Sequence, residues 1–62
     1  MREEARKYIA EGWGEEATAE WLADNEGEEE WAMADQICTW ADAEEEEVPA
    51  DILAWAREIL SR

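Results

Sequence analysis

The chain has 62 residues, with 19 Asp and Glu against 5 Lys and Arg, a formal net charge of −14, one cysteine and no histidine. A chain of this length forms one domain near the lower size limit for folding alone, and a single cysteine excludes an internal disulfide bond. The charged N-terminus and the lack of a long apolar run predict no signal peptide and no membrane association, so the expected compartment is the cytoplasm.

High charge with low hydrophobicity is typical of disordered chains. Here, however, five Trp, one Tyr and aliphatic residues at helical spacing predict a packed core. No apolar/polar alternation and only one Val speak against a sheet. We therefore expect an all-α fold, a small single-domain bundle of three to four short helices over residues 1–62.

Residues 2–11 predict the first helix, whose apolar side is formed by Ala5, Tyr8 and Ile9. Gly12 and Gly14 follow, and glycine is the usual residue where a helix ends in a left-handed conformation. This pattern places Trp13 in a turn, either as a core residue between the first two helices or as an exposed contact residue.

Residues 15–26 predict a second, shorter helix, and Asn25 with Gly27 supplies its end. Its expected inner face is formed by Ala17, Thr18, Trp21 and Leu22. Because the next helix follows immediately, we expect the second and third helices to form a hairpin.

The longest helical pattern runs from Glu28 to Glu47. One broad apolar stripe is formed by Met33, Ala34, Ile37, Cys38, Trp40 and Ala41, with Trp31 at its border. The carboxylates of residues 28–30 suit the positive end of the helix dipole, whereas those of residues 44–47 stand at the end where the dipole disfavours them. We therefore expect fraying at the second end, and a role for these acids other than stability.

The last helix is expected from about Pro49, because proline is favoured at the first helical position. Its apolar face is formed by Ile52, Leu53, Trp55, Ala56, Ile59 and Leu60. We expect this helix to be the main core partner of the third.

Little in the sequence predicts catalysis, so we expect no enzyme and no cofactor. Cys38 lies on the apolar stripe and is interpreted as a small core residue rather than a nucleophile. The acidic segment 24–28 does not fit a calcium-binding loop, because its glycine would put Leu22 in the first ligand position. No metal site is therefore predicted.

The basic residues lie only near the two ends of the chain, at Arg2, Arg6, Lys7, Arg57 and Arg62, whereas residues 8–56 contain sixteen acids and no base. Such a charge excludes direct binding to nucleic acid and favours a basic partner. A domain of this length is roughly 27 Å across. Double-stranded DNA carries about 16 phosphate charges over that length, so the density of charge is similar to that of DNA.

The leading hypothesis is a DNA mimic that occupies the basic groove of a nucleic-acid-binding protein. In size and charge the chain resembles the small acidic proteins that bacteriophages and mobile elements use against restriction enzymes, CRISPR effectors or host DNA-binding proteins. The expected contact residues are Glu28, Glu29, Glu30, Asp35, Asp42, Glu44, Glu45, Glu46 and Glu47. A second cluster comprises Glu15, Glu16, Glu20 and Asp24.

Two alternatives remain open. In the first, the chain is an adaptor or small subunit that binds a partner through an exposed Trp, such as Trp13, or through an apolar groove. A homodimer is compatible with this hypothesis and with the DNA mimic. Alternatively, its acidic surface is an adaptation to high salt. In each case crowded carboxylates predict raised pKa values and a stability that increases as the pH falls from 7 towards 5.

Overall fold

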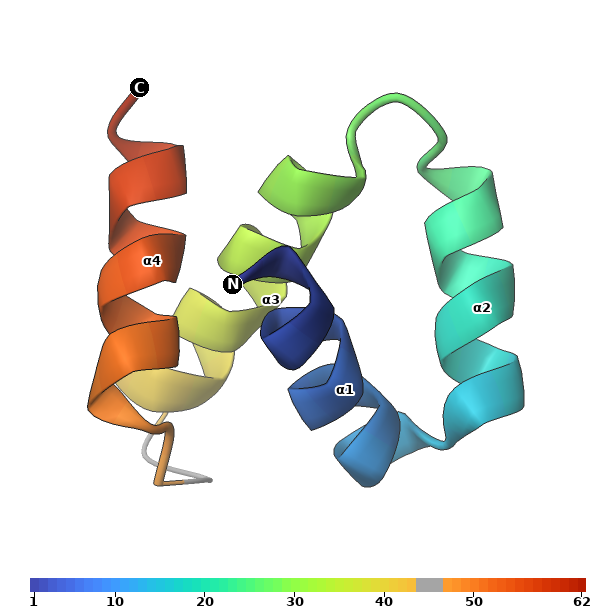
Figure 1. The fold of residues 1–62 in the computed structure, drawn as a ribbon, viewed down its shortest axis with the longest axis horizontal. Coiled ribbons are helices and arrows are strands. Elements are labelled where there is room, and N and C mark those ends of the chain that lie inside the picture. Colours follow the sequence, from blue (N-terminus) through green and yellow to red (C-terminus); the bar gives the residue numbers. More distant parts are fainter. Residues whose placement is uncertain (44–46) are drawn as a thin grey trace.

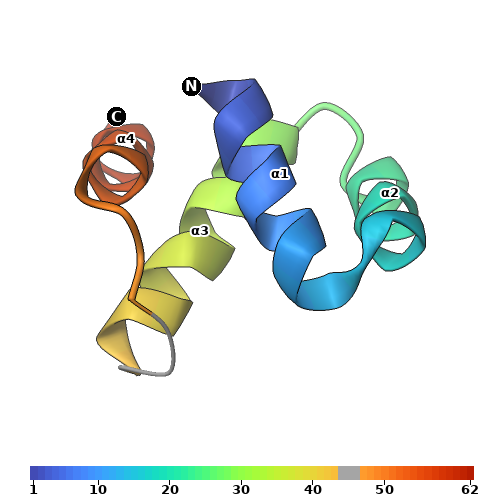
Figure 2. The ribbon, with the colours of Figure 1, turned by 60° about the horizontal axis from the view of Figure 1, so that its bottom comes forward.

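The computed structural model describes residues 1–43 and 47–62. Its helices are α1 (Arg2–Trp13), α2 (Glu15–Asp24), α3 (Glu29–Asp42) and α4 (Ala50–Leu60), and the described residues contain no strand. The predicted all-α bundle is thus confirmed. In two views α1 and α3 lie in the middle, with α4 and α2 on opposite sides of them (Figures 1 and 2). None of the four helices has the length and apolar content that a membrane crossing needs.

The core lies between α1, α3 and α4. Its buried side chains are Ala5, Ile9, Met33, Ala34, Ile37, Ile52, Ala56 and Ile59. The most extensive helix pairing is that of α3 with α4, as the sequence predicts. The partly buried Cys38 packs at the edge of this core rather than within it. Burial raises the pKa of its thiol, with Asp42 acting in the same direction, so the reactive thiolate is disfavoured.

α1 is longer than predicted. It continues through Gly12 to Trp13, and of these two glycines Gly14 alone adopts a positive φ, of 95°. The Gly14 amide donates to the Ala10 carbonyl at 2.7 Å, which closes the helix. The expectation that Trp13 lies in a turn is therefore wrong. Trp13 is instead the last helical residue, and its ring contacts the rings of Trp21 in α2 and Trp40 in α3, which favours two more helical residues than predicted in spite of Gly12.

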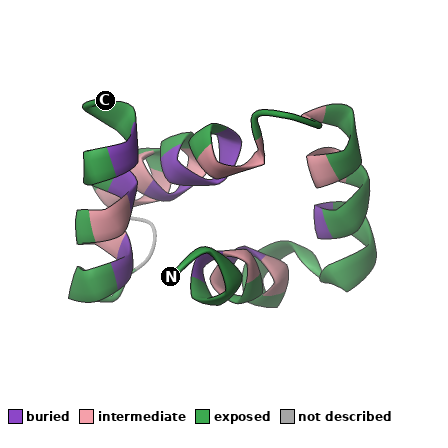
Figure 3. Cartoon of the chain, turned by 45° about the horizontal axis from the view of Figure 1, so that its top comes forward, coloured by how far each residue is buried: buried purple, intermediate pink, exposed green. Residues whose placement is uncertain are grey.

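The predicted hairpin of α2 with α3 is also wrong, because α2 packs mainly on α1. Only Thr18 of α2 is buried; its hydroxyl donates to the Gly14 carbonyl at 2.8 Å. Trp21 and Leu22 reach the core in part, whereas Ala17, expected on the inner face, is exposed. Figure 3 shows α2 as mostly exposed, in contrast to the buried faces of α3 and α4. α2 therefore forms an arm, Glu15–Asp24, that contacts the rest of the molecule along one narrow side of the helix.

The ends of α3 and α4 differ from the predicted bounds. Glu28 directly precedes α3, which ends at Asp42 rather than at Glu47, and Glu47 is exposed outside any helix. Glu44, Glu45 and Glu46 lie outside the described residues, so the predicted fraying of that segment falls there too. Pro49 is the residue before the first turn of α4.

Candidate partner-binding surface

Three acids of α2 form a row along its exposed side. Glu16, Glu20 and Asp24 follow one another at intervals of four residues, about 6 Å apart along the helix axis. All three are exposed, and the structure places no cation within ion-pair distance of them among the described residues. Because Thr18, Trp21 and Leu22 occupy the opposite side of the helix, the row faces away from the core.

Glu15, in the same predicted cluster, is paired. Its Oε1 accepts from Arg6 Nη2 of α1 at 2.6 Å. This hydrogen bond from Arg6, with the charge of the guanidinium, lowers the pKa of Glu15, and the pKa of Arg6 is raised in turn. The expectation of a raised pKa is wrong for Glu15, because a base distant in sequence reaches it across the α1–α2 turn.

The acids at the start of α3 are also partly neutralised. Arg2 of α1 lies 3.8 Å from a carboxylate oxygen of Glu29 and 3.9 Å from one of Glu30. Glu29 accepts from the Gly27 amide at 2.9 Å. Its pKa is lowered by hydrogen bonds from its own amide and from that of Gly27, and by the charge of Arg2. Glu28, by contrast, is exposed and forms no ion pair among the described residues.

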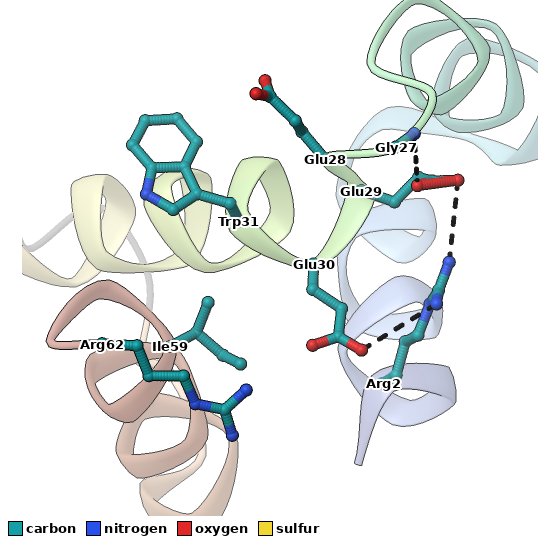
Figure 4. Close-up of a pocket in the computed structure, with 8 residues that line it drawn as sticks. All are labelled: Arg2, Gly27, Glu28, Glu29, Glu30, Trp31, Ile59 and Arg62. Atoms are coloured by element: carbon teal, nitrogen blue, oxygen red, sulfur yellow. Dashed lines mark hydrogen bonds and ion pairs between the residues drawn. The ribbon is translucent and has the colours of Figure 1, made fainter.

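An open groove of about 550 Å³ lies between this end of α3 and the C-terminal end of α4. Its lining comprises Arg2, Gly27, Glu28, Glu29, Glu30, Trp31, Ile59 and Arg62 (Figure 4). Trp31 is 54% exposed, more than any other large apolar side chain of the described residues. Trp31, which the sequence places at the border of the apolar stripe, therefore lies outside the core.

Trp13, the other exposed Trp, lies at the second surface hollow, about 700 Å³, with Glu15, Glu16, Ala17 and Glu20. Its ring meets those of Trp21 and Trp40 edge to face, with centroids 4.9 and 5.5 Å away. At 38% exposure, Trp13 is both a packing residue between helices and a visible part of the surface. Its predicted partner contact remains a prediction.

The remaining predicted contact residues lie apart from these two clusters. Asp35 and Asp42 are exposed along α3, seven residues apart and hence nearly on one line. Glu47 is exposed between α3 and α4. The structure thus gathers the predicted acids into an α2 row, a partly neutralised α3 start and isolated positions.

Sequence reasoning missed Arg2 and Arg6 as partners of these acids. Their spacing of four residues puts both on one face of α1, and this is the signal that could have found them.

Among the described residues, no three side chains of the Cys, Asp or Glu type converge as metal ligands would. The five bases are all on α1, on α4 or next to α4, and among the described residues only Arg6 forms an ion pair with an acid of α2. Comparison of the chain with protein-family models, curated proteins and solved structures gives no match.

Proposed function

We propose that this chain is a DNA-mimic inhibitor, which binds a basic nucleic-acid-binding protein and occupies the groove that the nucleic acid would use. The observation that carries this proposal is the unpaired acidic row of Glu16, Glu20 and Asp24 on an arm that the core barely covers. A basic groove can approach this row without displacing any ion pair that the described residues form. Restriction enzymes, CRISPR effectors and host DNA-binding proteins are the classes of partner that the size and charge favour.

The amount of charge fits this role. The longest extent of the Cα trace is 25 Å, and a net charge of −14 over that length is one charge per about 1.8 Å. Double-stranded DNA carries one charge per about 1.7 Å of its axis. The α2 row alone is sparser, with about 6 Å between charges, against about 3.4 Å on one DNA strand. We therefore propose that the chain imitates the overall charge and length of a DNA segment, and not the positions of its individual phosphates.

Ion pairing favours α2 as the first contact. The start of α3 shares its charge with Arg2, and Glu15 shares its charge with Arg6. Exposed pairs of this kind are weak, so a partner can replace them, but only at the loss of an existing interaction. The row of Glu16, Glu20 and Asp24 has no ion-pair partner among the described residues. We therefore propose this row as the first contact with the partner. The sequence alone favours the acids at the start of α3 for that role.

The test is a displacement experiment. The immobilised chain captures proteins from lysate of the source cell, and bound protein is eluted either with duplex DNA or with polyglutamate at equal concentration of charge. A DNA mimic predicts release by DNA at a lower charge concentration than by polyglutamate, because the partner's groove fits DNA. Equal release by both polymers, or no release by DNA, would contradict the proposal. In the second case an adaptor function through Trp31 becomes the better explanation.

A further inference from the structure

We infer that the groove between α3 and α4 binds an arginine side chain of the basic partner, stacked on Trp31 and paired with Glu28. This inference rests on the proposed function, since it specifies how a basic partner is recognised. Three features carry it: an exposed indole without a ring partner among the described residues, the Glu28 carboxylate on the same side of the helix end, and the apolar Ile59 on the facing wall of the groove. Figure 4 shows Glu28 and Trp31 pointing to the same side of the start of α3 and Glu30 pointing towards Arg2, with Ile59 and Arg62 across the groove.

The spacing of the residues suits a planar cation. Glu28 precedes Trp31 by three residues, and side chains at this spacing are neighbours on a helix surface. A guanidinium can stack on the indole face while its N–H groups donate to a carboxylate at the edge of the ring. A lysine ammonium can do only one of these well, because it is a compact, strongly hydrated charge. The groove therefore favours arginine over lysine.

The charges already in the groove leave room for an incoming cation. Glu28 has no ion-pair partner among the described residues, and Glu30 has only the 3.9 Å contact with Arg2, in which both side chains are largely exposed. The chain's own Arg62 contributes to the lining, but its Nη2 lies 3.3 Å from Glu58. No arginine of the described residues is therefore paired with the Glu28 carboxylate.

The second hollow repeats the same combination of groups. There Trp13 lies beside Glu15, Glu16 and Glu20. Thus each of the two exposed tryptophans of the described residues adjoins three glutamates. In the second hollow, however, the Trp13 ring is engaged by Trp21 and Trp40, and Glu15 by Arg6. The Trp31 groove is consequently the one in which an aromatic face and carboxylates are both available.

The test uses capped nonaarginine and nonalysine peptides, titrated calorimetrically into the full chain at about 0.1 M salt. We expect wild type to bind the arginine peptide about threefold to tenfold more tightly, in the range of one cation–π contact with an exposed ring. Because carboxylates in general prefer arginine to lysine, the informative variant is Trp31→Leu, which keeps an apolar side chain. It should lose most of the arginine preference and leave the affinity for the lysine peptide unchanged, whereas Trp31→Phe should retain part of the preference.

The Glu28 carboxylate is tested by the variant Glu28→Gln. It should weaken the binding of both peptides more than Asp35→Asn, which removes the same charge outside the groove. Unchanged circular dichroism verifies the fold of each variant. If Trp31→Leu keeps the full arginine preference, or wild type binds both peptides equally, the groove is not an arginine site, but the proposed function stands. If wild type binds neither peptide, the proposed function fails as well.

Discussion

The Trp13 ring at the end of α1 meets the Trp21 ring of α2 edge to face, with the ring centroids 4.9 Å apart. Trp13 makes a similar contact with Trp40 of α3, and Trp40 in turn contacts Tyr8 of α1. These rings join α2 to the rest of the molecule, since α2 has only one buried residue, Thr18. The position of the acidic arm therefore depends on Trp13.

Replacement of Trp13 by alanine should destabilise the protein by about 2 kcal/mol, because it removes two edge-to-face ring contacts and partly buried area. Trp31→Ala is the matched control, since its ring is the more exposed and contacts no other ring of the described residues. It should cost less than about 0.5 kcal/mol. Urea denaturation of both variants measures the difference, and equal losses would contradict the structural role of Trp13. Trp13→Ala is consequently a poor test of partner binding, because it also loosens the arm.

The backbone amides of α2 should exchange hydrogen faster than those of α3 and α4. The reason is that α2 contributes one buried residue, against four in α3 and three in α4. Native-state hydrogen exchange followed by NMR or mass spectrometry measures this. Thr18→Ala should raise the exchange rates within α2 further, by removing a buried methyl group and the hydrogen bond to Gly14. Protection of α2 equal to that of α3 would show that the arm is an integral part of the core.

The Arg6–Glu15 pair predicts a defined dependence of stability on pH. A carboxyl whose pKa is lower in the folded than in the unfolded state contributes stability above its unfolded pKa and loses it as the pH falls. For Glu15 and Glu29 the usual value is 4.5, so their contribution is present at pH 7 and at pH 5 and declines below about pH 4.5. For these two residues, a stability that rises towards pH 5 is not expected.

Two variants isolate this pair. Arg6→Gln and Lys7→Gln each remove one positive charge from α1, but Lys7 is exposed and has no ion-pair partner among the described residues. At pH 7, Arg6→Gln should therefore be the less stable of the two in chemical denaturation. The difference should shrink as the pH falls below about 4.5, because the contribution of a carboxyl with a lowered pKa is lost as it takes up its proton. A difference that stays constant down to pH 3 would mean that Arg6 acts through packing rather than through Glu15.

Stability should rise with salt between about 0.1 M and 1 M, over which the Debye length falls from about 10 Å to about 3 Å. Salt also weakens the ion pairs, but all four found among the described residues are exposed and hence of small energy. A net charge of −14 within a radius of gyration of 10.7 Å repels over longer distances, so its screening should dominate. Thermal melts with sodium chloride test this, and a lower midpoint at high salt would show that the ion pairs outweigh the repulsion.

Local patterns in the sequence were sufficient to predict four helices, the α3–α4 core pairing and most buried positions, because helical periodicity determines which side of each helix is apolar. They did not predict the relation of α2 to α1. A short connection favours a hairpin of α2 with α3, but the Trp13–Trp21 contact holds α2 against α1. A contact between rings from different helices is not visible in the periodicity of either helix.

The candidate surface was predicted in part for the same reason. The acidic row of Glu16, Glu20 and Asp24 follows from spacing alone. The neutralisation of Glu15 and Glu29 does not, because Arg6 and Arg2 reach them from another helix. Similarly, the border position of Trp31 on the apolar stripe leaves its exposure undecided until the placement of α4 is known.

The most direct test of the account compares two triple variants for affinity to the DNA-displaceable partner. One carries Glu16→Gln, Glu20→Gln and Asp24→Asn on α2; the other carries Glu3→Gln, Glu4→Gln and Glu11→Gln on α1, all of which are exposed. Each removes three negative charges, which changes the net charge from −14 to −11. If the α2 row is the contact surface, the affinity of the first variant for the partner should fall by about tenfold or more. The affinity of the second should stay within about threefold of wild type. Equal weakening of both would contradict the account, because binding would then follow the net charge alone.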